Sequence, residues 1–368
     1  MTAAAARPRV VHLVPAPFGQ GGLVGGAERY VFELARHMAE RVDTRLVTFG
    51  DAPSVTTNGP LTVQVLGPAR HVRGQRSNPF SWRLVGALAG AEVVHCHQQH
   101  IVATSIAAMA ARLRGQCVFC TDLGGGGWDI SGYVSTDRLF HGHLHISEYS
   151  RHAFGHDALP TAHVIYGGVD TTRFSPGQPS APSIDCLFVG RLLPHKGVDV
   201  MLEAVPEYLE TVVMGPAPDS RYLADLQALA RGKRVTFRHD CDDDAIVAAY
   251  RSARVVVLPS LYEDRYGGTT RVPELLGQTL LEGMACGTPG LCTSVASLPE
   301  VVVDGVTGRV VPPHDRAAMR DALLWFRNHP GEQRDMGEAG RARVLTKFTW
   351  PAVVDRCLEL YAGCTGIS

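Results

Sequence analysis

The sequence predicts an α/β fold made of two domains, each built around a mainly parallel β-sheet. The chain has 368 residues, and at roughly 100–200 residues per domain two domains are expected. Short apolar segments alternate with amphipathic segments along the whole chain, which is typical of strands joined by helices. A turn-rich stretch without periodicity, residues 167–182, interrupts this alternation and marks the domain boundary.

The elements of the first half are predicted from their periodicity. The predicted strands are residues 9–15, 45–49, 61–66, 92–97, 116–120, 144–147 and 162–166. The predicted helices are residues 27–40 and 101–114.

The second half restarts the same alternation and ends with one more helix. Its predicted strands are residues 184–189, 210–214, 234–237 and 255–258, with several helices between them, and the final amphipathic helix is residues 350–362. The predicted domains are therefore residues 1–176 and 177–347, followed by a C-terminal segment, residues 348–368. Ligands of such sheets bind at the carboxyl ends of the strands.

The charge balance argues against a protein that binds nucleic acid. The chain has 35 Lys and Arg residues against 36 Asp and Glu residues, a formal charge of −1, whereas nucleic-acid binders normally carry a basic domain or stripe. Only three of the basic residues are lysines: Lys196, Lys233 and Lys347.

The cysteines and the apolar segments predict a cytoplasmic protein. Nine cysteines, an odd number, are scattered without the short, even spacing of a secreted disulfide framework. Cys117 and Cys120 lie in a predicted strand, where buried thiols are favoured over a redox pair. We expect no signal peptide and no membrane-spanning helix, because no segment reaches the ~18–20 apolar residues that a span needs.

Glycines at residues 21–26 lie between the first predicted strand and the first predicted helix. Glycines at this position allow backbone N–H groups to approach a phosphate at a helix N-terminus. They are equally compatible with turn geometry alone. The G-x-G-x-x-G dinucleotide motif does not fit, which disfavours NAD.

A second motif follows the first predicted strand of the second domain. Arg191 and Lys196 lie on a loop bounded by Gly190 and Gly197, and two fixed positive charges there suit a diphosphate. The alternative is a solvated loop. We favour binding, because Lys196 is one of only three lysines in the chain.

The third motif is a pair of glutamates at the start of an apolar helix. If the helix begins near Leu276, Glu282 lies roughly 9 Å along its axis, since each residue rises about 1.5 Å. Phosphates at the helix N-terminus would leave Glu282 near an attached ribose and Glu274 near the group beyond the phosphates. The helix dipole alone accounts for Glu274, but it does not account for Glu282 within Leu-Leu-Glu-Gly-Met.

Taken together, these motifs resemble glycosyltransferase family 4, whose members are retaining enzymes of the GT-B fold that use nucleotide sugars. The segments that match in order are Gly-Gly-Ala-Glu-Arg at 25–29, Ser-Glu-Tyr-Ser-Arg at 147–151, residues 164–174 before the boundary, Val-Gly-Arg with Lys-Gly at 189–197, the two glutamates with Met-Ala-Cys-Gly-Thr-Pro at 284–289, and residues 298–308. The resemblance implies two facing Rossmann-like domains, a deep interdomain cleft and a C-terminal helix that crosses back to the first domain.

The resemblance also implies roles for single residues. Glu274 is associated with the donor sugar, Glu282 binds the ribose, and Arg191 and Lys196 bind the diphosphate. Asp122 matches a family aspartate, so the expected catalytic residues are Glu274, Arg191, Lys196 and Asp122. Further positions expected near the donor phosphates are Gly25, Gly26, Gly190, Leu276, Gly277 and Gln278.

One part of the family pattern is altered. Where the family commonly has a histidine, this chain has Thr121, followed by Asp122 and by four glycines that begin at Gly124 and end before Trp128. The glycines suggest a flexible wall of the acceptor site, with tight packing of the loop as the equal alternative. The candidate acceptor-site residues are His97, Thr121, Gly124 and Trp128.

No metal site is predicted. His95 and His97 are expected on one face of a strand, and residues 141–145 contain three more histidines, but neither group shows a carboxylate or thiolate at suitable geometry. The family does not need a metal for the diphosphate, because Arg191, Lys196 and a helix N-terminus take its charge. We therefore expect no cofactor besides the nucleotide sugar.

An arginine-rich segment, residues 69–83, contains no acidic residue. Its four arginines form either a solvated loop or a contact with an anionic acceptor or a membrane surface.

The resemblance thus implies a retaining glycosyltransferase. It implies a UDP-sugar as the donor, with a GDP-sugar as the alternative, and the expected acceptor is a small molecule, a lipid or a glycan, in natural-product or cell-envelope biosynthesis. The rival interpretations are a nucleotide-dependent oxidoreductase or epimerase and a non-catalytic relative that binds a sugar nucleotide.

Overall fold

The computed structural model describes residues 8–17, 26–178 and 181–366. It divides into two compact units, one made of Met1–Gly168 with Trp350–Ser368 and the other of Val169–Thr349. The first break therefore precedes the boundary predicted at residue 176, and the second follows the one predicted at residue 347. Both units are α/β, as the sequence predicts.

Unit 1 is built on an eight-stranded sheet in the order β10-β9-β8-β7-β1-β2-β4-β3, in which only β3 runs antiparallel to its neighbour. Its strands are β1 (Arg9–Pro17), β2 (Asp43–Phe49), β3 (Ser54–Asn58), β4 (Leu61–Leu66), β7 (Val93–Cys96), β8 (Cys117–Cys120), β9 (Gly142–His145) and β10 (Ala162–Val164). Each strand predicted in the first half is confirmed, although β9 begins earlier than the predicted residue 144.

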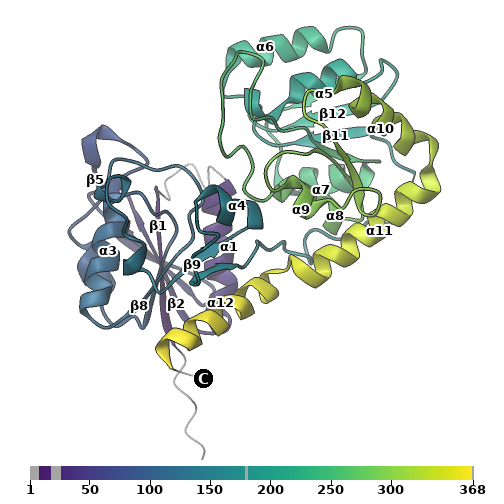
Figure 1. Cartoon of the computed structure of the whole chain (residues 1–368). Helices are drawn as coiled ribbons and strands as arrows, with labels where there is room; N and C mark the ends of the chain where they lie inside the picture. The colour runs from purple at the N-terminus through teal and green to yellow at the C-terminus, as the bar shows by residue number, and fades with distance from the viewer. Residues whose placement is uncertain (1–7, 18–25, 179–180, 367–368) are drawn as a thin grey trace, which may run out of the picture. The chain divides into compact units, whose positions relative to one another are not determined.

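The helices and small elements of unit 1 come between these strands in the sequence, and α1 and α3 are labelled beside the sheet in Figure 1. They are α1 (Gly26–Ala39), α2 (Leu84–Ala87), α3 (Val102–Leu113), α4 (Glu148–Ala153), the two-stranded sheet β5 (Arg70–His71) with β6 (Pro79–Phe80), and the 3-10 turns η1 (Val72–Gly74), η2 (Ile130–Gly132) and η3 (Asp137–Leu139). Helix α3 packs through the alanines Ala103, Ala107 and Ala111, which are fully buried. Their spacing of four residues places them on one side of the helix.

Unit 2 is a six-stranded parallel sheet in the order β13-β12-β11-β14-β15-β16. Its strands are β11 (Cys186–Val189), β12 (Thr211–Met214), β13 (Val235–Arg238), β14 (Val256–Leu258), β15 (Gly290–Thr293) and β16 (Gly308–Val311). The other elements are η4 (Pro194–Lys196), α5 (Val198–Ala204), α6 (Ser220–Leu229), α7 (Asp243–Ser252), α8 (Gln278–Ala285), α9 (Leu298–Val301), α10 (Arg316–Asn328) and α11 (Pro330–Lys347). This is the Rossmann strand order, in which the direction of winding reverses between the first strand, β11, and the fourth, β14.

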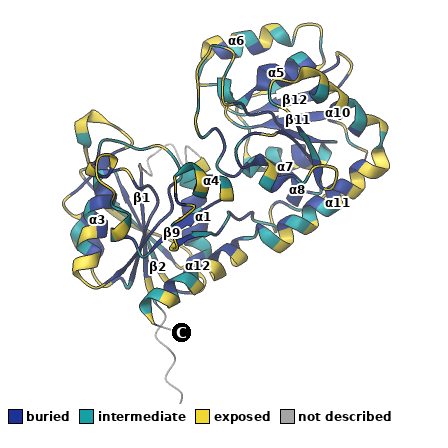
Figure 2. Ribbon diagram, in the orientation of Figure 1, coloured by how far each residue is buried: buried dark blue, intermediate teal, exposed yellow. Residues whose placement is uncertain are grey.

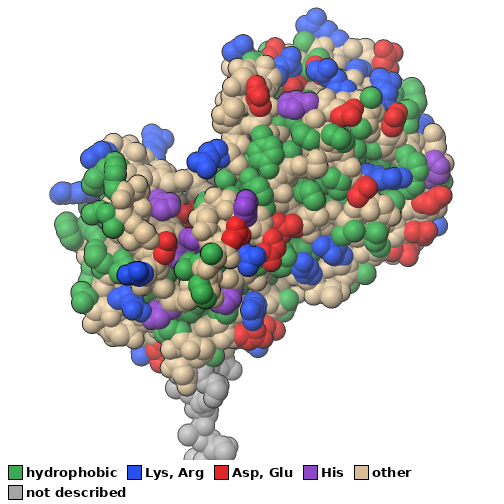
Figure 3. Space-filling model, viewed as in Figure 1, with side chains coloured by type: hydrophobic (Ala, Val, Ile, Leu, Met, Phe, Trp, Pro, Cys, Tyr) green, Lys and Arg blue, Asp and Glu red, His purple; other side chains and the backbone are tan. Residues whose placement is uncertain are grey.

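Burial follows the layers of each unit. Figure 2 shows central strands such as β11 and β12 in dark blue, while α10 and α11 carry exposed residues. On the face seen in Figure 3, basic and acidic side chains are interspersed. None of the described helices is both long enough and apolar enough to cross a bilayer.

The last helix, α12 (Trp350–Thr365), belongs to unit 1 and packs on α1, as predicted for a helix that crosses back (Figure 1). The Trp350 ring lies 5.4 Å from that of Tyr30, and the Tyr361 ring lies 4.8 Å from that of Phe119. The Tyr361 hydroxyl also lies 2.7 Å from His95 Nδ1. The far end of α12 is linked covalently to β8 by a disulfide between Cys117 and Cys364.

This disulfide corrects the expectation that Cys117 is a free buried thiol. Its partner is Cys364, far away in sequence, and not Cys120 of the same strand. Cys120 is a free buried thiol, and burial raises its pKa well above the usual range. A spacing rule that considers only near neighbours could not find a partner at the other end of the chain.

Removal of the disulfide is expected to destabilise unit 1. Because the bond closes a loop of 247 residues, Cys364→Ser should lower the free energy of unfolding by about 2–5 kcal/mol under non-reducing conditions. Denaturant unfolding followed by circular dichroism measures this loss.

Reductant provides the control for this prediction. It should lower the stability of the wild type to that of Cys364→Ser and leave the variant unchanged, and Cys241→Ser, which alters a free half-buried thiol, should behave as the wild type. Equal stabilities of the wild type and Cys364→Ser without reductant would contradict the disulfide.

Candidate functional site

The candidate donor site of unit 2 lies where the winding of the sheet reverses. Gly190 follows β11 directly, and Ser260 comes shortly after β14. In open α/β sheets, the carboxyl ends of the two strands at this reversal form the binding crevice. The loops that continue from β11 and β14 carry Lys196 and Glu274 to this crevice.

Gly197 fixes the loop that holds Lys196. It has φ 66°, in the left-handed region, and a Cβ atom there would lie 2.1 Å from the carbonyl oxygen of Pro259. Only glycine combines this backbone angle with so close an approach. The η4 turn is thereby held against the segment after β14, which places Lys196 beside Ser260.

Lys196, Glu274 and Ser260 form one hydrogen-bonded group. Lys196 Nζ donates to Glu274 Oε1 at 2.5 Å, and Ser260 Oγ donates to the same oxygen at 2.7 Å. The Lys196 and Glu274 side chains are only 17% and 10% exposed. A charged pair in so enclosed a place interacts more strongly than a surface pair.

The positive charge of Lys196 affects the protonation of the adjacent His195. Burial, together with the charge of Lys196, lowers the pKa of His195. His195 is therefore neutral at pH 7, and Lys196 carries the fixed positive charge of the η4 turn. Arg191 lies on the same loop with an exposed side chain.

Glu282 is buried inside α8 and is 7% exposed. The Tyr250 hydroxyl donates to Glu282 Oε2 at 3.0 Å, and burial followed by the charge of Glu282 raises the pKa of Tyr250 well above its usual range. This hydrogen bond holds the Glu282 carboxyl group in position inside the helix.

Helix α8 begins later than predicted. It starts at Gln278, after Gly277 with φ 79°, and not near Leu276. Glu282 is therefore about 6 Å along the axis from the first helical residue. The Thr279 hydroxyl donates to the Val189 carbonyl at 2.9 Å, which holds the start of α8 beside Gly190.

The structure therefore brings together most of the predicted donor-site residues of unit 2. Gly25 lies outside the described residues, and Gly26 is the first residue of α1. The sequence analysis missed Ser260, Tyr250 and Thr279, which orient the predicted glutamates and the start of α8. Of these three, only Ser260 could have been predicted from the sequence, because it follows the carboxyl end of an apolar strand, where ligands of such sheets bind.

The acceptor-site candidates of unit 1 lie after β7 and β8. Thr121 Oγ1 lies 2.8 Å from His95 Nε2. Asp122 accepts hydrogen bonds from the backbone N–H groups of Gly124 at 2.9 Å and Gln99 at 3.3 Å, and burial raises its pKa.

The glycine loop before Trp128 is bound to the arginine-rich segment. Arg73 lies 3.9 Å above the Trp128 ring, Gln75 Oε1 accepts from Trp128 N–H at 2.7 Å, and Asn78 Nδ2 donates to the Trp128 carbonyl at 2.8 Å. These contacts support the packing alternative for this loop.

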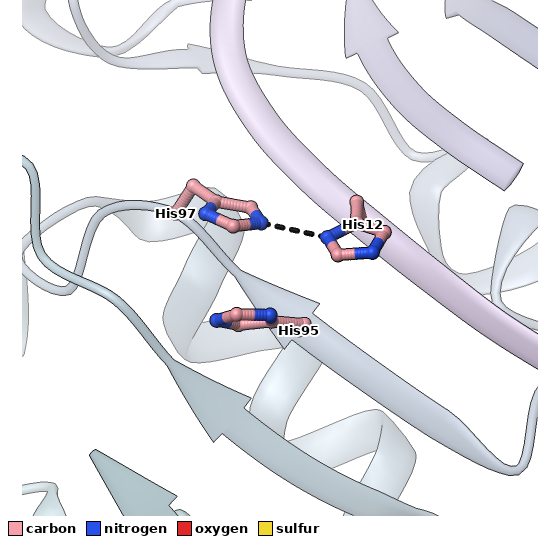
Figure 4. Close-up of side chains that lie close together, drawn as sticks. All are labelled: His12, His95 and His97. Carbon is pink, nitrogen blue, oxygen red and sulfur yellow. Dashed lines mark hydrogen bonds between the residues drawn. The ribbon is translucent and has the colours of Figure 1, made fainter. Parts of the chain in front are cut away.

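His12, His95 and His97 form a buried cluster at the centre of the unit 1 sheet (Figure 4). His12 Nδ1 lies 2.8 Å from His97 Nε2, and the rings of His95 and His97 are 4.2 Å apart, which confirms that these two share a face. Burial lowers the pKa of His12 to about 3, and burial with neighbouring imidazoles lowers the pKa values of His95 and His97 well below the usual range. All three are neutral at pH 7.

Family comparisons agree with this geometry. The family model described as "Glycosyltransferase Family 4" matches residues 24–173, and the model "Glycosyl transferases group 1" matches residues 171–343. The chain belongs to glycosyltransferase family 4. Both models describe glycosyltransferases, which argues against the oxidoreductase and epimerase alternatives.

Three curated relatives illustrate the range of this family. The D-inositol 3-phosphate glycosyltransferase of Thermomonospora curvata is 32% identical over 220 residues, 55% of this chain and 48% of the relative. A GDP-mannose-dependent phosphatidylinositol monomannoside mannosyltransferase of Mycolicibacterium smegmatis is 31% identical over 59% of this chain and 61% of the relative. The matches to these two relatives span only about half to three fifths of their lengths. The phosphatidyl-myo-inositol mannosyltransferase of Mycobacterium leprae is 26% identical over 92% of both chains.

Solved structures of this fold match nearly the whole chain. Sucrose-phosphate synthase of Thermosynechococcus elongatus has a TM-score of 0.74 at 20% identity and covers 98% of this chain and 100% of its own. HepE of Anabaena, solved with UDP and glucose, has a TM-score of 0.71 at 16% identity and covers 97% of this chain and 100% of its own. The predicted GT-B fold of two Rossmann-like domains is confirmed.

The buried histidines make unit 1 sensitive to acid. Each histidine takes up a proton below about pH 6.5 in the unfolded chain but not in the folded one, so the stability falls as the pH is lowered. The loss is up to about 1.4 kcal/mol per pH unit for each histidine. Denaturant unfolding between about pH 7.5 and pH 5 measures it.

His12→Gln should reduce this pH dependence, because one buried titrating group is removed. The exposed His152 provides the control, and His152→Gln should keep the slope of the wild type. A His12→Gln slope equal to that of the wild type would contradict the assignment of a neutral buried His12.

Proposed function

We propose that the chain transfers a sugar from a nucleotide diphosphate donor to an acceptor hydroxyl with retention at the anomeric carbon. The observation that carries the proposal is the Lys196–Glu274–Ser260 group at the carboxyl ends of β11 and β14. A nearly enclosed lysine held at the binding edge of a Rossmann sheet suits the phosphates of a nucleotide.

Different residues of unit 2 bind different parts of the donor. Lys196 and Arg191 neutralise the diphosphate as it leaves, and the N-terminus of α8 adds its partial positive charge near Leu276, Gly277 and Gln278. Glu282 accepts from the ribose hydroxyls, and Glu274 faces the transferred sugar. Because these groups take the charge of the diphosphate, the transfer requires no metal ion at the donor.

The acceptor attacks on the face from which the nucleotide diphosphate leaves. No covalent nucleophile is part of the proposal, and the leaving phosphate oxygen accepts the proton of the attacking hydroxyl. The bond from the anomeric carbon to the phosphate oxygen breaks and the bond to the acceptor oxygen forms. This route gives retention without an enzyme-bound sugar.

The names of the relatives bear on the substrates. The sequence favours a UDP-sugar, and HepE was solved with UDP and glucose, whereas one relative is named for GDP-mannose. Inositol phosphate and phosphatidylinositol compounds recur in the names of the relatives. We therefore propose a UDP- or GDP-hexose as the donor and a polyol, free, phosphorylated or attached to a lipid, as the acceptor.

Removal of Lys196 or Glu274 should impair the transfer. Lys196→Ala and Glu274→Gln are each expected to lower kcat by about 10²–10³-fold, the effect of losing one preorganised electrostatic contact to the leaving group or the sugar. Release of nucleotide diphosphate, measured by a coupled assay, reports the rate.

Lys347→Ala is the matched control, since it removes one of the other two lysines, at the end of α11. It should retain the rate of the wild type. Unchanged turnover in both site variants would refute the proposed site. Donor binding without release of nucleotide in the wild type would favour the non-catalytic alternative.

The donor can be identified by stabilisation. At a concentration 100-fold above its Kd, a bound donor stabilises the folded protein by about 2.7 kcal/mol, so only the true nucleotide sugar should raise Tm clearly among UDP-, GDP- and dTDP-sugars. Lys196→Ala should remove most of the shift.

The anomeric configuration of the product, read by NMR, tests retention, and an inverted product would contradict the proposed mechanism.

A further inference from the structure

A second cluster of ionisable side chains lies in unit 1, at the end of β9. Asp137 comes from the η3 turn, His143 from β9, and His156 from the segment after α4. His143 Nε2 and His156 Nε2 each lie 3.9 Å from Asp137 Oδ1. The chosen ligand atoms of all three residues lie within 4.8 Å of one another.

His143 carries an unsatisfied nitrogen in this cluster. The residue is 2% exposed, and its Nε2 atom has no hydrogen-bond partner among the described residues. An unpaired polar atom in the interior destabilises the folded state, and such atoms are rare in native structures. The atom is directed at a carboxylate that is too far away for a hydrogen bond and close enough to share an ion.

The other two residues are oriented by further partners. His156 Nδ1 lies 3.1 Å from His145 Nε2, so its Nε2 atom faces Asp137. Gln99 Nε2 donates to Asp137 Oδ1 at 2.7 Å, and Ser135 Oγ donates to Asp137 Oδ2 at 2.9 Å. Metal ligands in proteins are commonly oriented by a second layer of hydrogen bonds of this kind.

We propose that Asp137, His143 and His156 bind a divalent transition-metal ion of the Zn²⁺ type. Two imidazoles and one carboxylate suit zinc, iron or manganese, whereas magnesium and calcium prefer an all-oxygen set. Ligands at about 2.0–2.2 Å from a tetrahedral ion are roughly 3.3 Å apart. The two His–Asp separations are 3.9 Å, and all three ligand atoms lie within 4.8 Å of one another, so the side chains would have to move inward to bind one ion.

The ion would retain an open position. Asp137 and His156 line a cavity of about 360 Å³, together with Gln99, His100 and the 131–136 segment. Three protein ligands leave at least one coordination position of zinc for a water molecule or a ligand oxygen. The cluster is therefore a site at which a bound ion faces a cavity large enough for a small molecule. This inference does not depend on the proposed donor chemistry of unit 2.

Two other groups in unit 1 fit an ion less well. His12, His95 and His97 include no carboxylate, and His95 already bonds Thr121 and Tyr361 through its two ring nitrogens. The sulfur atoms of Cys117 and Cys364, which lie near His141, are joined in the disulfide.

Metal binding to the full chain, prepared without a polyhistidine tag and treated with a chelator, tests the inference. The wild type should bind one equivalent of Zn²⁺ in competition with a chromogenic chelator, and Co²⁺ should give the visible absorption of a low-symmetry site. Mg²⁺ should not compete. Asp137→Asn, which keeps the shape of the side chain, and His143→Gln should each weaken Zn²⁺ binding at least about 10-fold.

Two variants serve as controls. His152→Gln removes an exposed histidine close to the site, and His12→Gln removes a member of the other histidine cluster, and both should bind Zn²⁺ as the wild type does. Circular dichroism confirms that each variant is folded, and the stoichiometry of the wild type tests the inference even where a variant does not fold.

Several outcomes would overturn the proposal. These are a wild type that binds no equivalent of Zn²⁺ or Co²⁺, site variants that keep the affinity of the wild type, or loss of binding in His12→Gln with retention in Asp137→Asn. None of these outcomes bears on the release of nucleotide diphosphate, so failure here is distinct from failure of the proposed transfer.

Discussion

The pairing of β11 with β14 determines where unit 2 can perform chemistry. These strands are neighbours in the sheet but not in the sequence, and the connections on either side of them wind in opposite directions. Their carboxyl ends are therefore left uncovered by a crossover. The loops that follow these two strands carry Lys196, Ser260 and Glu274 to this place. Gly197 completes the arrangement, because any side chain there would collide with the Pro259 carbonyl.

In the proposed transfer, the ion pair of Lys196 and Glu274 is what prepares this crevice for an anion. A flexible lysine loses rotamer freedom when it binds a phosphate, and this loss weakens binding. Here the loss has already occurred on folding, because Glu274 holds the ammonium group at 2.5 Å. Ser260 donates to the same carboxylate oxygen and fixes the glutamate in turn. Under the proposed function, a diphosphate meets a cation that is already in position. The charge of Lys196 also offsets the repulsion between the diphosphate and the Glu274 carboxylate.

The sequence was sufficient for most strands of both units, but not for β3, β15 or β16, and it was insufficient for the partners of the charged residues. Buried strands such as β7 and β14 form apolar runs, whereas β3 was missed because all five of its residues are exposed. The motif around Glu274 and Glu282 identified both glutamates. Tyr250, which bonds Glu282, lies on another helix, and Cys364 lies at the other end of the chain from Cys117. Contacts between distant segments leave no local periodicity, so neither could be predicted from spacing.

The two histidine pairs of unit 1 show how far a local pattern can be interpreted. His95 with His97 and His143 with His145 have the same spacing, on or just after β7 and β9, two parallel strands that lie on either side of β8. The first pair meets His12, Thr121 and Tyr361, so most of its ring nitrogens bond to neutral groups. The second pair meets Asp137 and His156, which arrive from a turn and from the segment after a helix. The strand pattern determines on which face the imidazoles lie, but the loops determine whether they meet a carboxylate. The expectation that the histidines of residues 141–145 have no carboxylate at hand therefore does not hold for His143, whose nearest acidic group lies on a separate turn of the chain.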